Sequence, residues 1–160
     1  MNHHITHDAQ FPLSSENIRL LAELGFMAAN GGQLDIALGI FRGLSVLRPS
    51  KVFSYVGLAV AYLNVGLIEK AITELIPASE IVDSEHEQIW IYLGLAYQRS
   101  GFLVKSRNIL HHLLEIDALN EIDKKFVISI LNNDSTNQFN LTAPLPALVI
   151  EQHFISENLV

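Results

Sequence analysis

Residues 90–101 read WIYLGLAYQRSG, and this stretch decides how the chain folds. Its apolar residues recur with the spacing of one face of an α-helix, and Gly101 stands where that helix would end. Counting back from Gly101, glycines recur at Gly66 and Gly32, at intervals of 35 and 34 residues. A repeat of this length predicts a stack of similar helical hairpins, each with a glycine in its turn.

Small residues follow the turn glycines at a constant distance, at Ala37, Ala71 and Ser106. A small side chain at this point lets the second helix of a hairpin lie close against the first. Pro49 closes the first unit, because proline stops a helix. Pro77 falls within the expected second helix of the second unit, and we expect it to kink or shorten that helix.

These positions resemble the tetratricopeptide repeat, whose signature is W-x2-L-G-x2-Y followed by A-x3-F and P. Residues 90–97 match its first half, and Ala37, Phe41 and Pro49 match its second half. The resemblance implies an all-α helical-hairpin repeat stack. Its expected parts are three tetratricopeptide units at residues 18–51, 52–85 and 87–120 and a capping helix at residues 121–131.

The repeats also divide the chain into segments. We expect an N-terminal extension at residues 1–13, the repeat domain at residues 14–131, and a polar linker with an apolar tail at residues 132–160. The first helix is predicted to begin at the Ser14-Ser15-Glu16 sequence. The apolar residues that the stack itself is expected to need include Leu24, Ala37, Phe41, Trp90 and Tyr97.

Composition excludes several classes of function. The 160 residues include no cysteine, which excludes disulfides and thiolate metal sites. The net charge of −7 argues against a nucleic-acid partner, which needs a basic face. No secretory signal and no apolar run long enough to span a membrane is recognised, so we expect a cytoplasmic protein without a membrane span. Only 17% of the residues are charged, which favours an apolar surface for a partner.

No sequence motif for catalysis is present, so we expect no enzyme, no catalytic residue and no cofactor. The acidic residues Asp117, Glu121 and Asp123 are interpreted as a solvated helix end. No metal site is expected from the seven histidines. His3, His4 and His7 lie in a segment without periodicity, where three imidazoles bind a metal only weakly. The adjacent His111 and His112 point about 100° apart on a helix, and His86 has no acidic or histidine partner four residues further on. The seventh histidine is His153.

The resemblance further implies a binding surface, because the first helices of tetratricopeptide units line a concave groove that holds a ligand peptide. The side chains that it places in this groove are Arg19, Phe26, Asn30, Phe53, Val56, Val60, Leu63, Asn64, Gln88, Ile91, Leu95 and Arg99, with Ala22, Ala29 and Gln98 beside them. Most of the large ones are apolar, which favours an apolar peptide or helix of a protein client. A clamp for a C-terminal carboxylate is not expected, because its positions hold Phe26, Phe53 and Gly57. In the alternative interpretation, some of these residues pack in the core or against the chain's own tail.

The small size, the acidity and the three repeats resemble the tetratricopeptide chaperones and accessory proteins of bacterial type III secretion. That resemblance implies a virulence-associated cytoplasmic chaperone that keeps a translocator or needle-type subunit soluble before export. Two alternatives stay open. The protein is a scaffold subunit or homodimer that buries its apolar excess between copies, or its tail at residues 141–160 folds back as an autoinhibitor of the groove. An enzyme with an unrecognised site is disfavoured, because repeat stacks supply surfaces more often than convergent catalytic groups.

Overall fold

The computed structural model describes residues 13–83, 86–116 and 119–133, so the predicted N-terminal extension and apolar tail lie outside the described residues, apart from Leu13 and the start of the linker. The described residues form helices and no strand, which confirms the all-α fold. The helices are α1 (Ser15–Asn30), α2 (Leu34–Leu47), α3 (Phe53–Asn64), α4 (Ile68–Ala78), α5 (His86–Arg99), α6 (Leu103–Glu115) and α7 (Glu121–Asn133).

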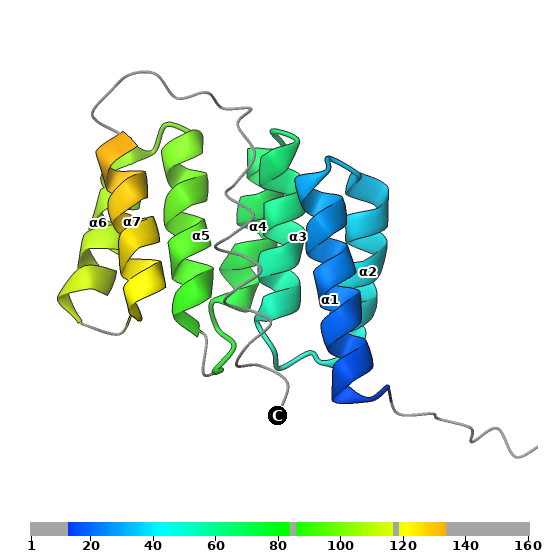
Figure 1. Ribbon diagram of the computed structural model, residues 1–160. Coiled ribbons are helices and arrows are strands. Elements are labelled where there is room, and N and C mark those ends of the chain that lie inside the picture. Colours follow the sequence, from blue (N-terminus) through cyan, green and yellow to red (C-terminus); the bar gives the residue numbers. More distant parts are fainter. Residues whose placement is uncertain (1–12, 84–85, 117–118, 134–160) are drawn as a thin grey trace, which may run out of the picture.

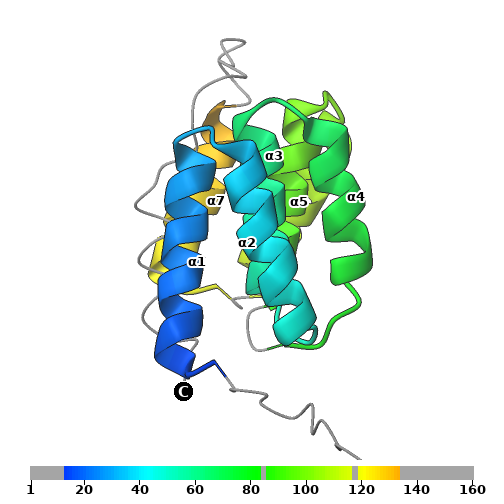
Figure 2. The same cartoon turned by 90° about the vertical axis from the view of Figure 1, so that its right-hand side faces the viewer.

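Three consecutive hairpins and one single helix form two layers. The hairpins are α1–α2, α3–α4 and α5–α6, and each later hairpin packs its first helix on both helices of the hairpin before it. Figure 1 shows α1, α3, α5 and α7 in the layer nearer the viewer, with α2, α4 and α6 behind them. Figure 2 shows the two layers from the α1–α2 end. The predicted helical-hairpin stack is therefore confirmed.

Glycine ends the first helix of each hairpin, as the 34-residue spacing predicts. Gly32, Gly66 and Gly101 have φ values of 70°, 78° and 85°, a region that residues with a Cβ rarely adopt. In the third turn the Phe102 N–H donates to the Tyr97 carbonyl at 2.8 Å and the Gly101 N–H to the Gln98 carbonyl at 3.0 Å. The other two turns repeat this pair of bonds, which satisfies carbonyls that a helix end leaves without partners.

The other helix boundaries follow from capping and from proline. The Ser14 side chain accepts a hydrogen bond from the Asn17 N–H at 3.2 Å, so α1 begins where the sequence predicts. Pro77 lies in the last turn of α4, which has 11 residues against 14 in α2. The capping helix α7 runs to Asn133, two residues beyond its predicted end.

The tightest packing in the stack surrounds one aromatic ring. Phe41 is 0% exposed and packs edge-on against Phe26, with ring centroids 4.8 Å apart. A Cβ on Gly25 of α1 would lie 2.8 Å from its ring, and a Cβ on Gly57 of α3 would meet three of its ring atoms still more closely. Phe41 therefore occupies the space that two glycines leave, one on its own hairpin and one on the next.

One residue expected in the stack's own packing lies on its surface. Ala37 and Phe41 are buried and Trp90 and Tyr97 are half-buried, but Leu24 is 54% exposed. The equivalent residues of the later hairpins, Leu58 and Leu93, are 2% and 3% exposed. They are covered by the preceding hairpin, and among the described residues no hairpin precedes α1. The expectation for Leu24 is therefore wrong.

We predict that Gly57→Ala lowers the free energy of unfolding by about 2–3 kcal/mol, because the new methyl group would overlap three ring atoms of the fully buried Phe41. The matched control is Gly39→Ala on the exposed side of α2, where an added Cβ meets nothing within 4 Å. This change should raise the free energy of unfolding by up to about 1 kcal/mol. Urea denaturation followed by far-ultraviolet circular dichroism measures the free energy of unfolding of both variants. Equal effects would contradict the conclusion that Phe41 fills the space beside Gly57.

Candidate functional site

The predicted groove positions fall on the helices of the nearer layer in Figure 1. They belong to α1, α3 and α5 and are spaced three and four residues apart, so within each helix they share one side. We call this side of the layer the concave face, after the groove that the tetratricopeptide resemblance predicts here. Figure 1 shows that no described helix crosses in front of it.

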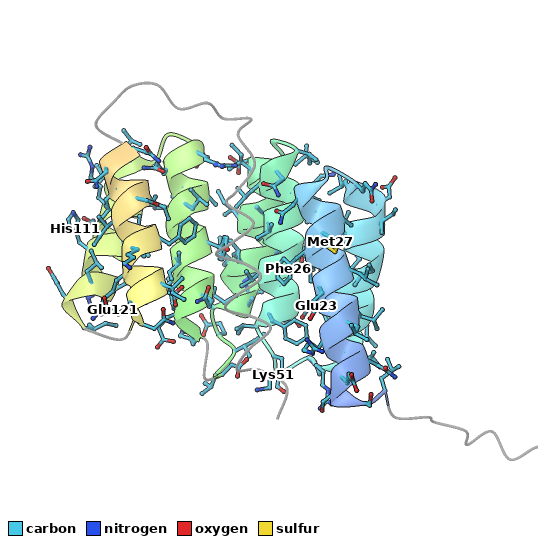
Figure 3. The ribbon with its side chains drawn as sticks, in the orientation of Figure 1. Glu23, Phe26, Met27, Lys51, His111 and Glu121 are labelled. Carbon is cyan, nitrogen blue, oxygen red and sulfur yellow. The ribbon has the colours of Figure 1, made fainter. Side chains whose placement is uncertain are left out.

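The apolar members of the concave face are removed from water. Phe53 is 6% and Leu95 3% exposed, and the others are 0% exposed: Phe26, Val56, Val60, Leu63 and Ile91. Of the polar members, Gln88 and Arg99 are buried, while Arg19, Asn30 and Asn64 are half-buried. Figure 3 labels Phe26 and its neighbour Met27, which is 60% exposed. Apolar side chains of α1 are thus buried on the concave face and exposed on the adjacent side of the helix.

Two polar residues predicted for the groove link neighbouring helices. The Asn64 amide on α3 donates to the Ala29 carbonyl of α1 at 3.1 Å and to Asn30 Oδ1 at 3.2 Å. In the same way Arg99 Nη1 on α5 donates to the Leu63 carbonyl of α3 at 3.1 Å. Both carbonyls lie in the last turn of a helix and also accept the N–H of the turn glycine, Gly32 or Gly66, so each side chain supplies an additional bond. Burial lowers the pKa of the Arg99 guanidinium from its usual value.

A buried acid holds α7 against α5, which sequence reasoning missed. Asp123 is 3% exposed, so its interpretation as part of a solvated helix end is wrong. Its Oδ2 accepts from Gln88 Nε2 at 2.8 Å and from Asn120 Nδ2 at 3.0 Å. Burial, and secondly the charge of Asp123, raises the pKa of the Tyr92 hydroxyl well above its usual range. The repeat spacing could have indicated the burial of Asp123, because it places this residue one period after Ile89, which is buried.

The α1–α2 end of the stack presents a second candidate surface, which faces the viewer in Figure 2. We call it the first-hairpin face and define it as Leu20, Leu24, Met27, Ile36 and Ile40. The first four are 44%, 54%, 60% and 55% exposed, and Ile40 is half-buried. A hollow of about 400 Å³ is lined by part of this face. The positions of α3 equivalent to the first three are buried against α1 and α2.

A third candidate is a cavity of about 510 Å³ between α5 and α6. Its wall includes Trp90, whose indole N–H donates to His86 Nε2 at 2.8 Å. His86 Nδ1 lies 2.8 Å from the Ile81 carbonyl, which only accepts, so Nδ1 carries the proton. The other lining residues are Glu87, Asn108, Ile109, His112, Leu113 and Ile116. Sequence reasoning examined His86 only for acidic and histidine partners, so it missed the tryptophan.

The described residues hold no group of three His, Asp or Glu side chains placed to bind a metal ion. None of the helices in the described ranges is both long and apolar enough to cross a membrane. The chain shows no significant match to a protein-family model, to a curated protein or to a solved structure. Its resemblance to tetratricopeptide proteins therefore stays a prediction from the repeat spacing and the signature residues.

We predict that Gln88→Leu lowers the free energy of unfolding by about 2 kcal/mol, because it removes a hydrogen bond to the buried Asp123 carboxylate. The matched control is Arg19→Leu, which removes a partly exposed i,i+4 ion pair with Glu23 and should cost less than about 0.5 kcal/mol. Urea titration of both variants measures the difference. If Gln88→Leu is no more damaging than the control, the buried bond does not hold α7 in place.

Proposed function

We propose that the protein is a non-enzymatic protein-binding module whose concave face holds an apolar segment of a protein client. The observation that carries this proposal is the chemistry of that face. Three successive helices place large apolar side chains on it, and its two basic residues already have partners. Arg19 pairs with Glu23 at 2.8 Å, and Arg99 donates to the Leu63 carbonyl.

The same chemistry selects against charged clients. A carboxylate brought onto the concave face would lose its hydration without meeting a lysine or arginine clamp, which costs several kcal/mol. An apolar segment gains about 25 cal/mol for each Å² of apolar surface removed from water. The face therefore suits a client segment that would aggregate if it stayed exposed.

Within this class, we propose a cytoplasmic chaperone that keeps a type III secretion substrate soluble before export. The support is the resemblance in size, acidity and repeat number to the chaperones of that system. Translocator and needle-type subunits are the clients that this resemblance implies, because the chaperones of that system keep such subunits soluble before export.

A methyl-NMR titration with a synthetic leucine-rich helical peptide tests the binding site. We predict that the peptide shifts the methyl signals of Val56, Val60 and Ile91, because a bound apolar ligand changes the atoms that surround these methyl groups. The methyl groups of Val46 and Val104, which are 80% and 72% exposed on α2 and α6, should stay unchanged.

Replacing the peptide's leucines with aspartates is the matched control and should weaken binding at least about tenfold, which corresponds to about 1.4 kcal/mol. A peptide that shifts signals only on the first-hairpin face, or that binds equally well with aspartates, would exclude the concave face as the client site.

A specific observation favours a second function, self-association through the first-hairpin face. A repeat stack normally presents a polar outer surface at its ends. The α7 end exposes Glu121 and Lys125 beside Ile122 and Ile128, whereas the first-hairpin face groups apolar residues that are mostly 44–60% exposed. Two copies that meet through their first hairpins bury this face symmetrically and close the assembly at two chains.

We predict that Leu24→Glu converts such a dimer into a monomer, because two carboxylates would be buried at its centre. Light scattering coupled to size exclusion should give about twice the chain mass of 17.8 kDa for the unmodified protein and a single chain mass for the variant. The matched control, Val104→Glu, adds the same charge on α6 and should leave the dimer intact. A monomeric unmodified protein at every concentration tested would rule out this second function.

A further inference from the structure

The concave face is shielded although the described helices leave it open. On α3, neighbouring helices lie on both sides, α1 and α5, and behind it, α2 and α4. The side chains of Val56, Val60 and Leu63 belong to its remaining side, and each is 0% exposed. A side chain on the open side of a helix layer keeps contact with water unless other atoms cover it.

Apolar residues on the other surfaces of the stack are not shielded in this way. Val46 on α2 and Val104 on α6 are 80% and 72% exposed, and Leu24 at the end of the stack is 54% exposed. The apolar side chains of the concave face are thus buried as fully as core residues such as Phe41 and Leu75, unlike these three surface residues. What covers this face must be chemically suited to it and must be able to reach it.

The segment at residues 141–160 meets both requirements. It reads LTAPLPALVIEQHFISENLV, with apolar residues that include Leu148, Val149, Ile150 and Phe154. Its only acids are Glu151 and Glu157, and it has no lysine or arginine, so most of its residues are uncharged like those of the concave face.

The geometry of the chain also allows this contact. The segment comes after α7, which ends at Asn133. Among the described helices, α7 is the last in the layer that also contains α1, α3 and α5. Residues 134–160 can span up to about 90 Å when extended. Neighbouring helices pack about 10 Å apart, so the distance from α7 to α1 is about 30 Å. The chain after α7 is thus long enough to cross the whole face.

We propose that residues 141–160 of the same chain occupy the concave face and take the place of the client until it binds. This proposal rests on the proposed function for its biological meaning but not for its test. Because tail and client compete for one face, the affinity for the client falls by the factor by which the closed state outweighs the open one. A closed state favoured a hundredfold would weaken client binding about a hundredfold.

The test needs no client. Since the chain contains no cysteine, Gln152→Cys accepts one nitroxide spin label in the full-length protein. We expect paramagnetic broadening of the methyl signals of Val56, Val60, Leu63 and Ile91 and none for Val104. Mixing spin-labelled chains with separate isotope-labelled chains should give no broadening, because the contact is within one chain. Broadening equal at Val104 and at the concave face, or broadening that appears in the mixed sample, would overturn the proposal.

Two variants give the second arm of the experiment. In the spin-labelled protein, the double change Ile150→Ser and Phe154→Ser should abolish the broadening, while Asn137→Ser outside the segment should preserve it. Neither variant alters a described residue, and far-ultraviolet circular dichroism checks that each keeps the helical stack. For the leucine-rich peptide, the double variant should also bind at least about tenfold more tightly than the Asn137→Ser protein. Broadening without any peptide binding would leave this inference intact and defeat the proposed function, whereas peptide binding without broadening would do the reverse.

Discussion

The stack depends on close contacts, within a hairpin and with the next one, at residues that lack bulk. Phe41 fills the space between Gly25 of its own hairpin and Gly57 of α3, so the second hairpin completes the core of the first. Within the third hairpin, Leu110 of α6 lies against Gly94 of α5 as Phe41 lies against Gly25. None of the described hairpins buries its own apolar surface alone, and stability is therefore shared between neighbours along the stack. The same dependence explains why the two ends of the stack differ so strongly.

The α7 end is built to close the stack. α7 places Asp123, Val127 and Ile130 where the later hairpins place the residues that pack on their predecessor, and all three are buried. The Gln88 and Asn120 hydrogen bonds to Asp123 compensate for burying its charge. At the other end, α1 has leucines and a methionine at the corresponding positions and exposes them. A surface that elsewhere joins two hairpins is here left for something else to cover.

Much of the fold could be predicted from the sequence, because its determinants are local and repeat. The glycines at positive φ, the capping Ser14 and the small Ala37 each act within a few residues, so the sequence alone indicates them. Leu24 could not be assigned in this way. Its place in the repeat is the same as that of the buried Leu58, and only the number of preceding hairpins separates the two.

The candidate site was harder to predict because a helix position does not reveal its hydrogen-bond partner. The positions of Asn64 and Arg99 suggest an amide and a guanidinium that donate to a ligand. Instead, Asn64 donates to a carbonyl at the end of α1, and Arg99 donates to a carbonyl at the end of α3. A residue at the edge of a helix face is close to both the neighbouring helix and the open side of the layer. Long-range geometry decides between them, and a single sequence does not contain it.

The concave face is formed by the first helices of the hairpins, α1, α3 and α5, and contacts that fix the spacing of these helices hold it in shape. Two of those contacts lie at its edge. Asn64 joins α3 to α1, and Arg99 joins α5 to α3, at the same end of each helix. A ligand on the concave face therefore meets a layer whose spacing is already set, so little of its binding free energy is spent on ordering the helices. Because water is already excluded from the face in the chain as it stands, a client must replace existing apolar contacts, and selectivity depends on the difference between two apolar ligands.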